Sequence, residues 1–220
     1  MMTLDEAVKK VRPLDEKAME GARKRWDSIA KPLHSLGELE NMLTQIAGIT
    51  GTPEVRVEKK AVVAMCADNG VVEEGVTQTG QEVTAIVAEN FSRHETSTCL
   101  MAEVAGVDIY PVDIGMITDV KNVTRKNEKT AYGTKNFAKE PAMTREQLWQ
   151  AIETGIRIAG EKKQEGYDIL LTGEMGIGNT TTSSAVASVL LNRDPAVMTG
   201  KGAGLDDEGL KRKIHVIEDA

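Results

Sequence analysis

The chain has 220 residues, 40% of them hydrophobic, which suits one domain with a sizeable core, or one domain with a small satellite. Its 27 Lys and Arg against 34 Asp and Glu argue against nucleic-acid binding, because phosphate backbones need a basic face. No stretch approaches the roughly 18 apolar residues of a membrane span, and no signal peptide is visible. We therefore expect a soluble, cytoplasmic protein with no nucleic-acid or membrane partner.

The first fifty residues have a helical pattern. Apolar residues recur at helical spacing over 4–11, and a second run covers 15–30. Ser35 and Glu38 form a capping-box pair, which predicts the start of a third helix. We expect residues 1–55 to form a small helical N-terminal subdomain.

From residue 59 onward, apolar runs alternate with helical stretches. The runs are 61–67, 107–115 and 167–173, and the helical stretches lie near 80–104 and 144–164, the second opening with a Thr144/Gln147 capping box. Runs that are apolar on both faces fit strands of a parallel sheet covered by helices. The pattern predicts an α/β fold over 56–220, with an open, mainly parallel, Rossmann-like sheet flanked by helices. The polar segment 116–142 is expected to be a long connection carrying a short hairpin.

Two cysteines and three histidines give no sign of a metal site. Cys66 and Cys99 lie in separate apolar segments, which favours buried free thiols over a disulfide. His34, His94 and His215 have no ligand spacing with one another or with the cysteines.

The most informative stretch is 172–184, TGEMGIGNTTTSS, which follows the third strand and precedes a helical run over 185–191. This places it at the carboxyl edge of a parallel sheet, where ligands bind. Its glycines let backbone N–H groups approach a ligand, and the helix start adds partial positive charge, so we expect a phosphate there. A tight turn capped by Asn179 or Thr180 is the alternative. The stretch has neither the lysine of a P-loop nor the full dinucleotide fingerprint.

Three charged residues close to the glycines are candidates for chemistry. Glu174, between two glycines, is able to bind sugar hydroxyls or act as a base, although a solvated loop carboxylate is the simpler explanation. A second glycine cluster, TGKGAG at 199–204, precedes another predicted helix and is also suited to phosphate. Lys201 or Lys213 would supply charge there, and the alternative is that each is an ordinary surface lysine.

These motifs resemble the nicotinate-nucleotide:dimethylbenzimidazole phosphoribosyltransferase family, which activates the lower-ligand base of cobamides. The resemblance runs along nearly the whole chain and includes KP at 31–32, SLGELE at 35–40, ADNGV at 67–71, VT at 83–84, VDIG at 112–115, GT at 133–134, AMT at 142–144, GEMGIGNTT at 173–181 and TGKGAGLD at 199–206. It implies transfer of the phosphoribosyl group of nicotinate mononucleotide to a base nitrogen, releasing nicotinate and forming α-ribazole phosphate with inversion. It also implies a homodimer and no metal or other cofactor.

The resemblance also assigns roles to residues. Glu174 matches a glutamate that looks like the ribose-side carboxylate, and it is the predicted catalytic residue. The predicted substrate-binding residues are Met175, Gly176, Gly178, Asn179, Thr180, Gly202 and Lys213, with Lys213 near the phosphate. Thr79, Val87 and Met175 match the wall of the base pocket. Some relatives have Gln where Val87 stands, so the acceptor is expected to be less polar than dimethylbenzimidazole, or phenolic.

One expected group has no counterpart. The family's principal catalytic base is a second glutamate far towards the C-terminus, beyond residue 220, so the chain is expected to lack the family's C-terminal part. Losing a positioned general base costs roughly 10²–10⁴-fold in rate. The main alternative is therefore a non-catalytic nucleotide-binding fragment or subunit. A nicotinamide-dinucleotide oxidoreductase is disfavoured by the missing fingerprint acid.

Overall fold

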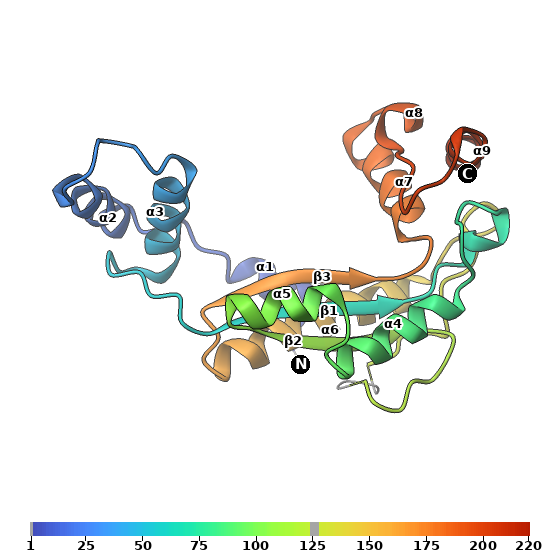
Figure 1. Ribbon diagram of the computed structural model, residues 1–220, viewed down its shortest axis with the longest axis horizontal. Coiled ribbons are helices and arrows are strands. Elements are labelled where there is room, and N and C mark those ends of the chain that lie inside the picture. The colour runs from blue at the N-terminus through green and yellow to red at the C-terminus, as the bar shows by residue number, and fades with distance from the viewer. Residues whose placement is uncertain (1, 124–127) are drawn as a thin grey trace. The chain divides into compact units, whose positions relative to one another are not determined.

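The computed structural model describes residues 2–123 and 128–220, shown in Figure 1. The chain divides into two compact units, Met2–Glu58 and Lys59–Ala220. No helix within the described residues has the length and apolar character needed to cross a membrane.

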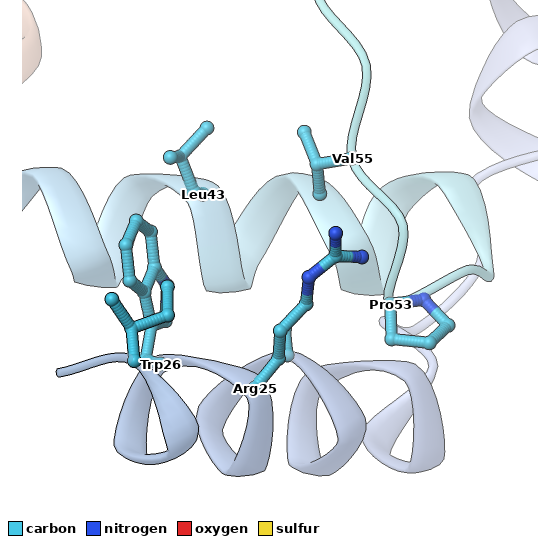
Figure 2. Close-up of a pocket in the computed structure, with 7 residues that line it drawn as sticks. Arg25, Trp26, Leu43, Pro53 and Val55 are labelled. Carbon is cyan, nitrogen blue, oxygen red and sulfur yellow. The ribbon is translucent and has the colours of Figure 1, made fainter.

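The N-terminal unit consists of three helices, α1 (Leu4–Lys9), α2 (Glu16–Ser28) and α3 (Glu38–Thr50). Helices α2 and α3 pack through small buried side chains, Ala18, Ala22 and Ala47, with Val55 beside them. Figure 2 shows a cavity of about 170 Å³ in this unit, lined by Ala22, Arg25, Trp26, Ile29, Leu43, Pro53 and Val55.

The capping box predicted at Ser35 and Glu38 is wrong. Helix α3 has Gly37 as its N-cap, with φ 54°, and no side chain caps it there. The buried carboxylate of Glu40 instead accepts from the Leu36 N–H at 3.1 Å and pairs with Lys31 Nζ at 2.7 Å. A buried carboxylate needs such partners, and this longer-range ion pair decides how the chain enters the helix.

The second unit is built on a parallel sheet, as predicted. Its strands are β1 (Lys60–Ala67), β2 (Val107–Gly115) and β3 (Ile169–Met175), in the order β2-β1-β3. Met65 on β1 pairs with Val112 on β2 and with Glu174 on β3. Strand β3 runs two residues further than the predicted 167–173, because Met175 packs into the core. Glu174 is thus held at the end of a strand and not in a loop.

Helices flank the sheet, and Figure 1 shows α4 and α5 on one face with α6 on the other. The bounds are η1 (Gly70–Glu74), α4 (Glu82–Ser92), α5 (Ser97–Ala105), α6 (Arg145–Gln164), α7 (Asn179–Leu191), α8 (Pro195–Met198) and α9 (Asp207–Glu218). The single helix expected near 80–104 is two helices, because His94 adopts φ 59° and Thr96 caps α5 by accepting from the Cys99 N–H at 3.1 Å. The Thr144/Gln147 capping box of α6 is confirmed.

Helix α7 begins six residues earlier than the predicted 185. Its first residues are threonines and serines, which are poor helix formers and conceal the helix from a sequence pattern. Serine hydroxyls of this helix donate to backbone carbonyls: Ser188 Oγ to the Ser184 carbonyl at 2.8 Å, and Ser184 Oγ to the Met198 carbonyl of α8 at 3.1 Å. The helix starts at Asn179, directly after its N-cap residue Gly178.

The chain order of the strands creates a crevice at one edge of the sheet. Strand β1 is central. The chain leaves it through α4 and α5 and returns in β2 on one side of β1, whereas β3 and the loop after it lie on the other side. Such a switch point, at the carboxyl ends of parallel strands, is where open α/β sheets bind ligands.

The connection over 116–142 packs against the ends of β1 and β2. The Gly133 N–H donates to the Gly115 carbonyl at 3.0 Å, and the Thr134 N–H donates to the Asp68 carbonyl at 3.0 Å. The short hairpin expected within 116–142 is not seen in the described part of this connection, which contains no strand, and residues 124–127 lie outside the described residues.

Both cysteines are free and buried, as predicted. Cys66 has no exposed surface and belongs to a core cluster with Ala85, Ala88 and Met116. Burial removes the hydration that a thiolate needs and raises the pKa of Cys66 to about 12.

We expect the folded chain to resist thiol reagents. At about pH 8 the Cys66 thiol stays protonated and inaccessible, so Ellman's reagent should react with it only after unfolding in guanidinium. The measurement is the thiol titre of native and unfolded protein. Rapid reaction of both cysteines in the native chain would contradict the packing described above.

Candidate active site

A cleft of about 110 Å³ lies at the crevice between the loops that follow β1 and β3. Three segments and one helix side chain line it: 76–79, 176–180, 201–205 and Lys213. The first segment follows β1 and η1, the second joins β3 to α7, and the third precedes α9. The cleft thus gathers both glycine clusters that the sequence singles out.

The loop over 176–178, which follows β3 and is called the glycine loop below, packs tightly against the end of β1. A Cβ at Gly176 would lie 2.3 Å from the Ala67 carbonyl oxygen, and a Cβ at Gly178 would lie 2.8 Å from Val72 Cγ2. Gly178 also has φ 88°, a conformation that L side chains rarely adopt. Close approach and backbone conformation together require glycine at these two positions.

Helix α7 starts without a side-chain cap, which contradicts the capped-turn alternative. Its N-cap is Gly178, which has no side chain to accept from the first N–H groups. The Asn179 side chain instead donates to Glu174, and the Thr180 hydroxyl contacts Lys213. The Asn179 and Thr181 N–H groups donate to the Gly176 and Gly178 carbonyls at 3.0 Å, so what this helix start offers an anion is mainly its partial positive charge.

Lys213 brings a buried positive charge to the same cleft. The residue is 1% exposed, and its Nζ lies 2.7 Å from Thr180 Oγ1 and 3.1 Å from the Gly200 carbonyl oxygen. No carboxylate within the described residues forms an ion pair with it, and burial lowers the pKa of Lys213. Buried charges are normally paired, so this lysine is suited to an anionic ligand.

The two lysines considered from the sequence have different environments. The surface explanation is wrong for Lys213, which packs beneath the loop that contains Gly202. A Cβ at Gly202 would lie 2.7 Å from Thr180 Oγ1 and 3.4 Å from Lys213 Nζ, so this glycine leaves room for their contact. Lys201 lines the cleft but is exposed, and it pairs with Asp207 at 2.6 Å.

Glu174 supplies a carboxyl group at the end of β3, next to this anion site. It accepts a hydrogen bond from Asn179 Nδ2. Glu174 is exposed at the surface, but nearby strand and loop atoms remove part of its hydration and raise the pKa of Glu174, which the Asn179 hydrogen bond opposes in part. A carboxylate with a raised pKa is a better proton acceptor, as a general base requires.

The structure brings together most of the predicted site residues. Those that line the cleft are Thr79, Gly176, Gly178, Asn179, Thr180, Gly202 and Lys213, and Glu174 is joined to them through Asn179. Val87 and Met175 do not line it, because both pack against the core cluster of Ala64, Phe91 and Cys99.

Three residues at the site were not predicted. Gln78 Nε2 donates to the Gly204 carbonyl, and both Asn69 and Thr84 bond to the backbone of Ile177. Asn69 follows a strand in the motif ADNG, where an amide at a carboxyl edge is a detectable signal. Thr84 lies on a helix and gives no such signal.

No cluster of three or more His, Cys, Asp or Glu side chains placed to hold a metal ion occurs in 2–123 or 128–220. The cleft itself combines a helix start, the buried Lys213 and backbone groups of two glycine-containing loops. These features define an α/β protein whose cleft, at the carboxyl edge of a parallel sheet, is suited to a phosphate-bearing ligand.

The comparisons with known proteins agree with this class. A sequence model described as Phosphoribosyltransferase matches residues 11–220, and the chain belongs to this family. Nicotinate-nucleotide–dimethylbenzimidazole phosphoribosyltransferase of Clostridium tetani is 47% identical over 220 residues, which cover 100% of this chain and 61% of the relative. The enzyme of the same name from Ruminiclostridium cellulolyticum is 48% identical over 219 residues, covering 100% of this chain and 62% of the relative.

The solved structures give the same result. The crystal structure of CobT from Thermus thermophilus superposes with a TM-score of 0.87 at 35% identity, covering 93% of this chain and 62% of that one. The predicted family and the α/β fold are both confirmed. The chain spans about three fifths of the length of these relatives.

Replacing Lys213 by methionine should weaken phosphate binding without destabilising the fold. A hydrogen bond to a charged group contributes about 1.5–3 kcal/mol, so titration calorimetry should show roughly 10–150-fold weaker binding of inorganic phosphate. Thermal stability should hold or rise, because an unpaired buried charge is removed. Lys211→Met, at an exposed position on the same helix, is the control and should leave binding unchanged.

The lowered pKa of Lys213 also predicts a proton linkage. Between the lowered pKa and the ordinary lysine value of about 10.4, the empty site carries no charge at this position. Phosphate favours the protonated amine, so binding there should take up a proton, and affinity should fall as pH rises through the lowered pKa. Calorimetry in buffers of different ionisation enthalpy measures this uptake; identical proton uptake in Lys213→Met would contradict the assignment.

Proposed function

We propose that this chain transfers the phosphoribosyl group of nicotinate mononucleotide to dimethylbenzimidazole or a related base, giving α-ribazole phosphate and nicotinate. The proposal rests mainly on the environment of Lys213. This lysine is buried, has no carboxylate partner among the described residues, and lies beside the uncapped start of α7. Glu174, a carboxyl group with a raised pKa, accepts a hydrogen bond from Asn179, the first residue of α7. The names of the relatives support the same reaction.

The arrangement suggests how the substrate is oriented. The nucleotide phosphate binds to Lys213 and is favoured by the partial positive charge at the start of α7. The ribose then extends towards Asn179 and Glu174, which places its anomeric carbon near the end of β3. With the phosphate and sugar held in this way, the anomeric carbon is oriented towards the incoming base, which lowers the entropic cost of bringing the two reactants together.

The bonds and protons of the transfer balance within this site. A ring nitrogen of the base attacks the anomeric carbon with its lone pair, the bond from that carbon to the nicotinate nitrogen breaks, and the pair stays on nicotinate. The attacking ring becomes cationic and loses its remaining N–H proton to the Glu174 carboxylate. The raised pKa of Glu174 favours this acceptance.

The acceptor is proposed to be an apolar base or a phenolic compound. The support is the family resemblance at the predicted base-pocket wall and not the cleft itself, because Val87 packs with Met175 against the core and does not line the cleft. Thr79 is the predicted wall residue that lines the cleft itself. Competition between benzimidazoles, purines and cresols in the transfer assay tests this preference, and an unchanged preference for dimethylbenzimidazole would discard it.

The transfer assay, together with one substitution, tests the proposed function. Wild-type chain with nicotinate mononucleotide and dimethylbenzimidazole should form α-ribazole phosphate, measured by chromatography. Glu174→Gln should lower kcat by roughly 10²–10⁴-fold, because a glutamine cannot take up the proton. The acid limb of the wild-type pH profile should lie above the ordinary glutamate pKa and be absent in this variant.

An exposed glutamate far from the cleft provides a matched control for Glu174→Gln. Glu103→Gln, at an exposed position on α5, should leave turnover unchanged. Nicotinate mononucleotide that stabilises the chain without forming product would favour the alternative, a nucleotide-binding fragment or subunit. Neither binding nor product would overturn the proposed function.

We further propose that the chain acts as a homodimer in the cytoplasm. Helices α7 and α8 expose a group of large apolar side chains, Val186, Val189, Leu190, Leu191 and Val197, and such patches commonly mark protein interfaces. The buried free thiols of Cys66 and Cys99 fit a reducing compartment.

Light scattering after gel filtration should give twice the 23.8 kDa of one chain. The variant Val189→Glu with Leu190→Glu should reduce the mass to that of a monomer, because charge on the apolar face opposes burial. A monomeric wild type would contradict the dimer, and an unchanged dimer in this variant would exclude this face as its interface.

A further inference from the structure

The glycine loop of the site is held at its centre by a side chain that takes no part in the proposed chemistry. Asn69 follows β1 and is 7% exposed. Its Nδ2 donates to the Ile177 carbonyl at 3.1 Å, and its Oδ1 accepts from Thr182 Oγ1 at 3.0 Å. One amide thus bonds both to the loop and to the first turn of α7.

A second side chain completes the attachment from another element. Thr84, on α4, has no exposed surface, and its Oγ1 accepts from the Ile177 N–H at 3.0 Å. Both backbone polar groups of Ile177 are therefore bonded to side chains about a hundred positions away in the chain. The loop cannot shift without breaking these bonds, and buried groups left unpaired are costly.

The segment around Asn69 is itself fixed on both sides. The Asp68 N–H donates to the Gly115 carbonyl at 3.0 Å, and the Gly70 N–H donates to Thr134 Oγ1 at 3.1 Å. A Cβ at Gly70 would lie 2.5 Å from the carbonyl carbon of Lys135, so the backbones are packed without spare room. Asn69 thus projects from a rigid support.

The loop also rests directly on Asn69. A Cβ at Gly176 would lie 3.0 Å from Asn69 Nδ2, and a Cβ at Gly178 would lie 3.2 Å from Asn69 Cβ. The two glycines on either side of Ile177 are therefore placed against the amide that bonds the residue between them. This contact decides where α7 starts and where Asn179 meets Glu174.

We propose that Asn69 is a positioning residue of the transfer site: with Thr84, it holds the loop over 176–179 so that the helix start and the Asn179–Glu174 pair face the same ligand. Asn69 acts through Ile177 and is not a catalytic residue. The inference rests on the proposed function for its effect on turnover, whereas its effect on the loop is independent of that function.

Four substitutions at Asn69 and Thr84 separate the contributions of these hydrogen bonds. Asn69→Ala removes both side-chain bonds, and Asn69→Asp keeps the acceptor for Thr182 but loses the donor to the Ile177 carbonyl. Thr84→Val keeps the shape of threonine and loses the acceptor for the Ile177 N–H, whereas Thr84→Ser keeps that hydroxyl and is the conservative rescue. Asn122→Ala is the control, because Asn122 is exposed and bonds only weakly to Glu89, at 3.4 Å.

The first measurement is hydrogen exchange of peptides covering 174–182. Exchange should be at least tenfold faster in Asn69→Asp and Thr84→Val, with peptides from α6 unchanged, and it should stay at the wild-type rate in Thr84→Ser and Asn122→Ala. Unchanged exchange in both Asn69→Asp and Thr84→Val would overturn the proposal. These variants keep the test valid even where Asn69→Ala fails to fold.

The second measurement is kinetic. A misplacement of about 1 Å costs up to roughly 10²-fold in rate, so kcat should fall 10–100-fold in Asn69→Asp while KM for nicotinate mononucleotide changes less than threefold. A fall in kcat no larger than that of Asn122→Ala would overturn the proposal. If the wild type shows no turnover, the proposed function fails, and the exchange measurement still decides whether Asn69 holds the loop.

Discussion

The site depends on one close approach, that of the loop after β3 to the end of β1. The Ala67 carbonyl oxygen stands 2.3 Å from where a Cβ of Gly176 would lie, so only glycine allows the two backbones to meet. Parallel pairing with β1 brings Glu174 level with Met65 and directs both strand ends to the same edge. Because the strands are in this register, the start of α7 lies in the cleft at the carboxyl ends of the strands.

Burial acts on the two ionisable groups of the site in complementary ways. It lowers the pKa of Lys213 and raises the pKa of Glu174, so it disfavours the charged form of each. In the proposed reaction, a bound phosphate would favour the protonated form of Lys213, and the cationic base would give its proton to the Glu174 carboxylate. Perturbed pKa values of this kind are typical of functional sites, and here Lys213 lines the cleft while Glu174 is joined to it through Asn179.

Membership in the phosphoribosyltransferase family and the geometry of the site support one another. The family match covers 11–220, and the superposition with the Thermus thermophilus structure covers 93% of the chain. The cleft is lined by residues that the motifs contain, including Gly178, Gly202 and Lys213. The relatives are longer than this chain, which spans 61–62% of the two that we describe.

The sequence by itself determined the features that depend on local pattern: the parallel strands, the Thr144 capping box, the two glycine clusters and the family. It did not determine which charges are buried. The Glu40–Lys31 pair displaced the expected Ser35 cap, and Lys213 proved to be buried where Lys201 is exposed. The bonds of Asn69 and Thr84 to Ile177 join segments about a hundred residues apart. Only the tertiary structure decided these, because burial and long-range hydrogen bonds arise from elements that meet after folding and leave no periodic signal in the chain.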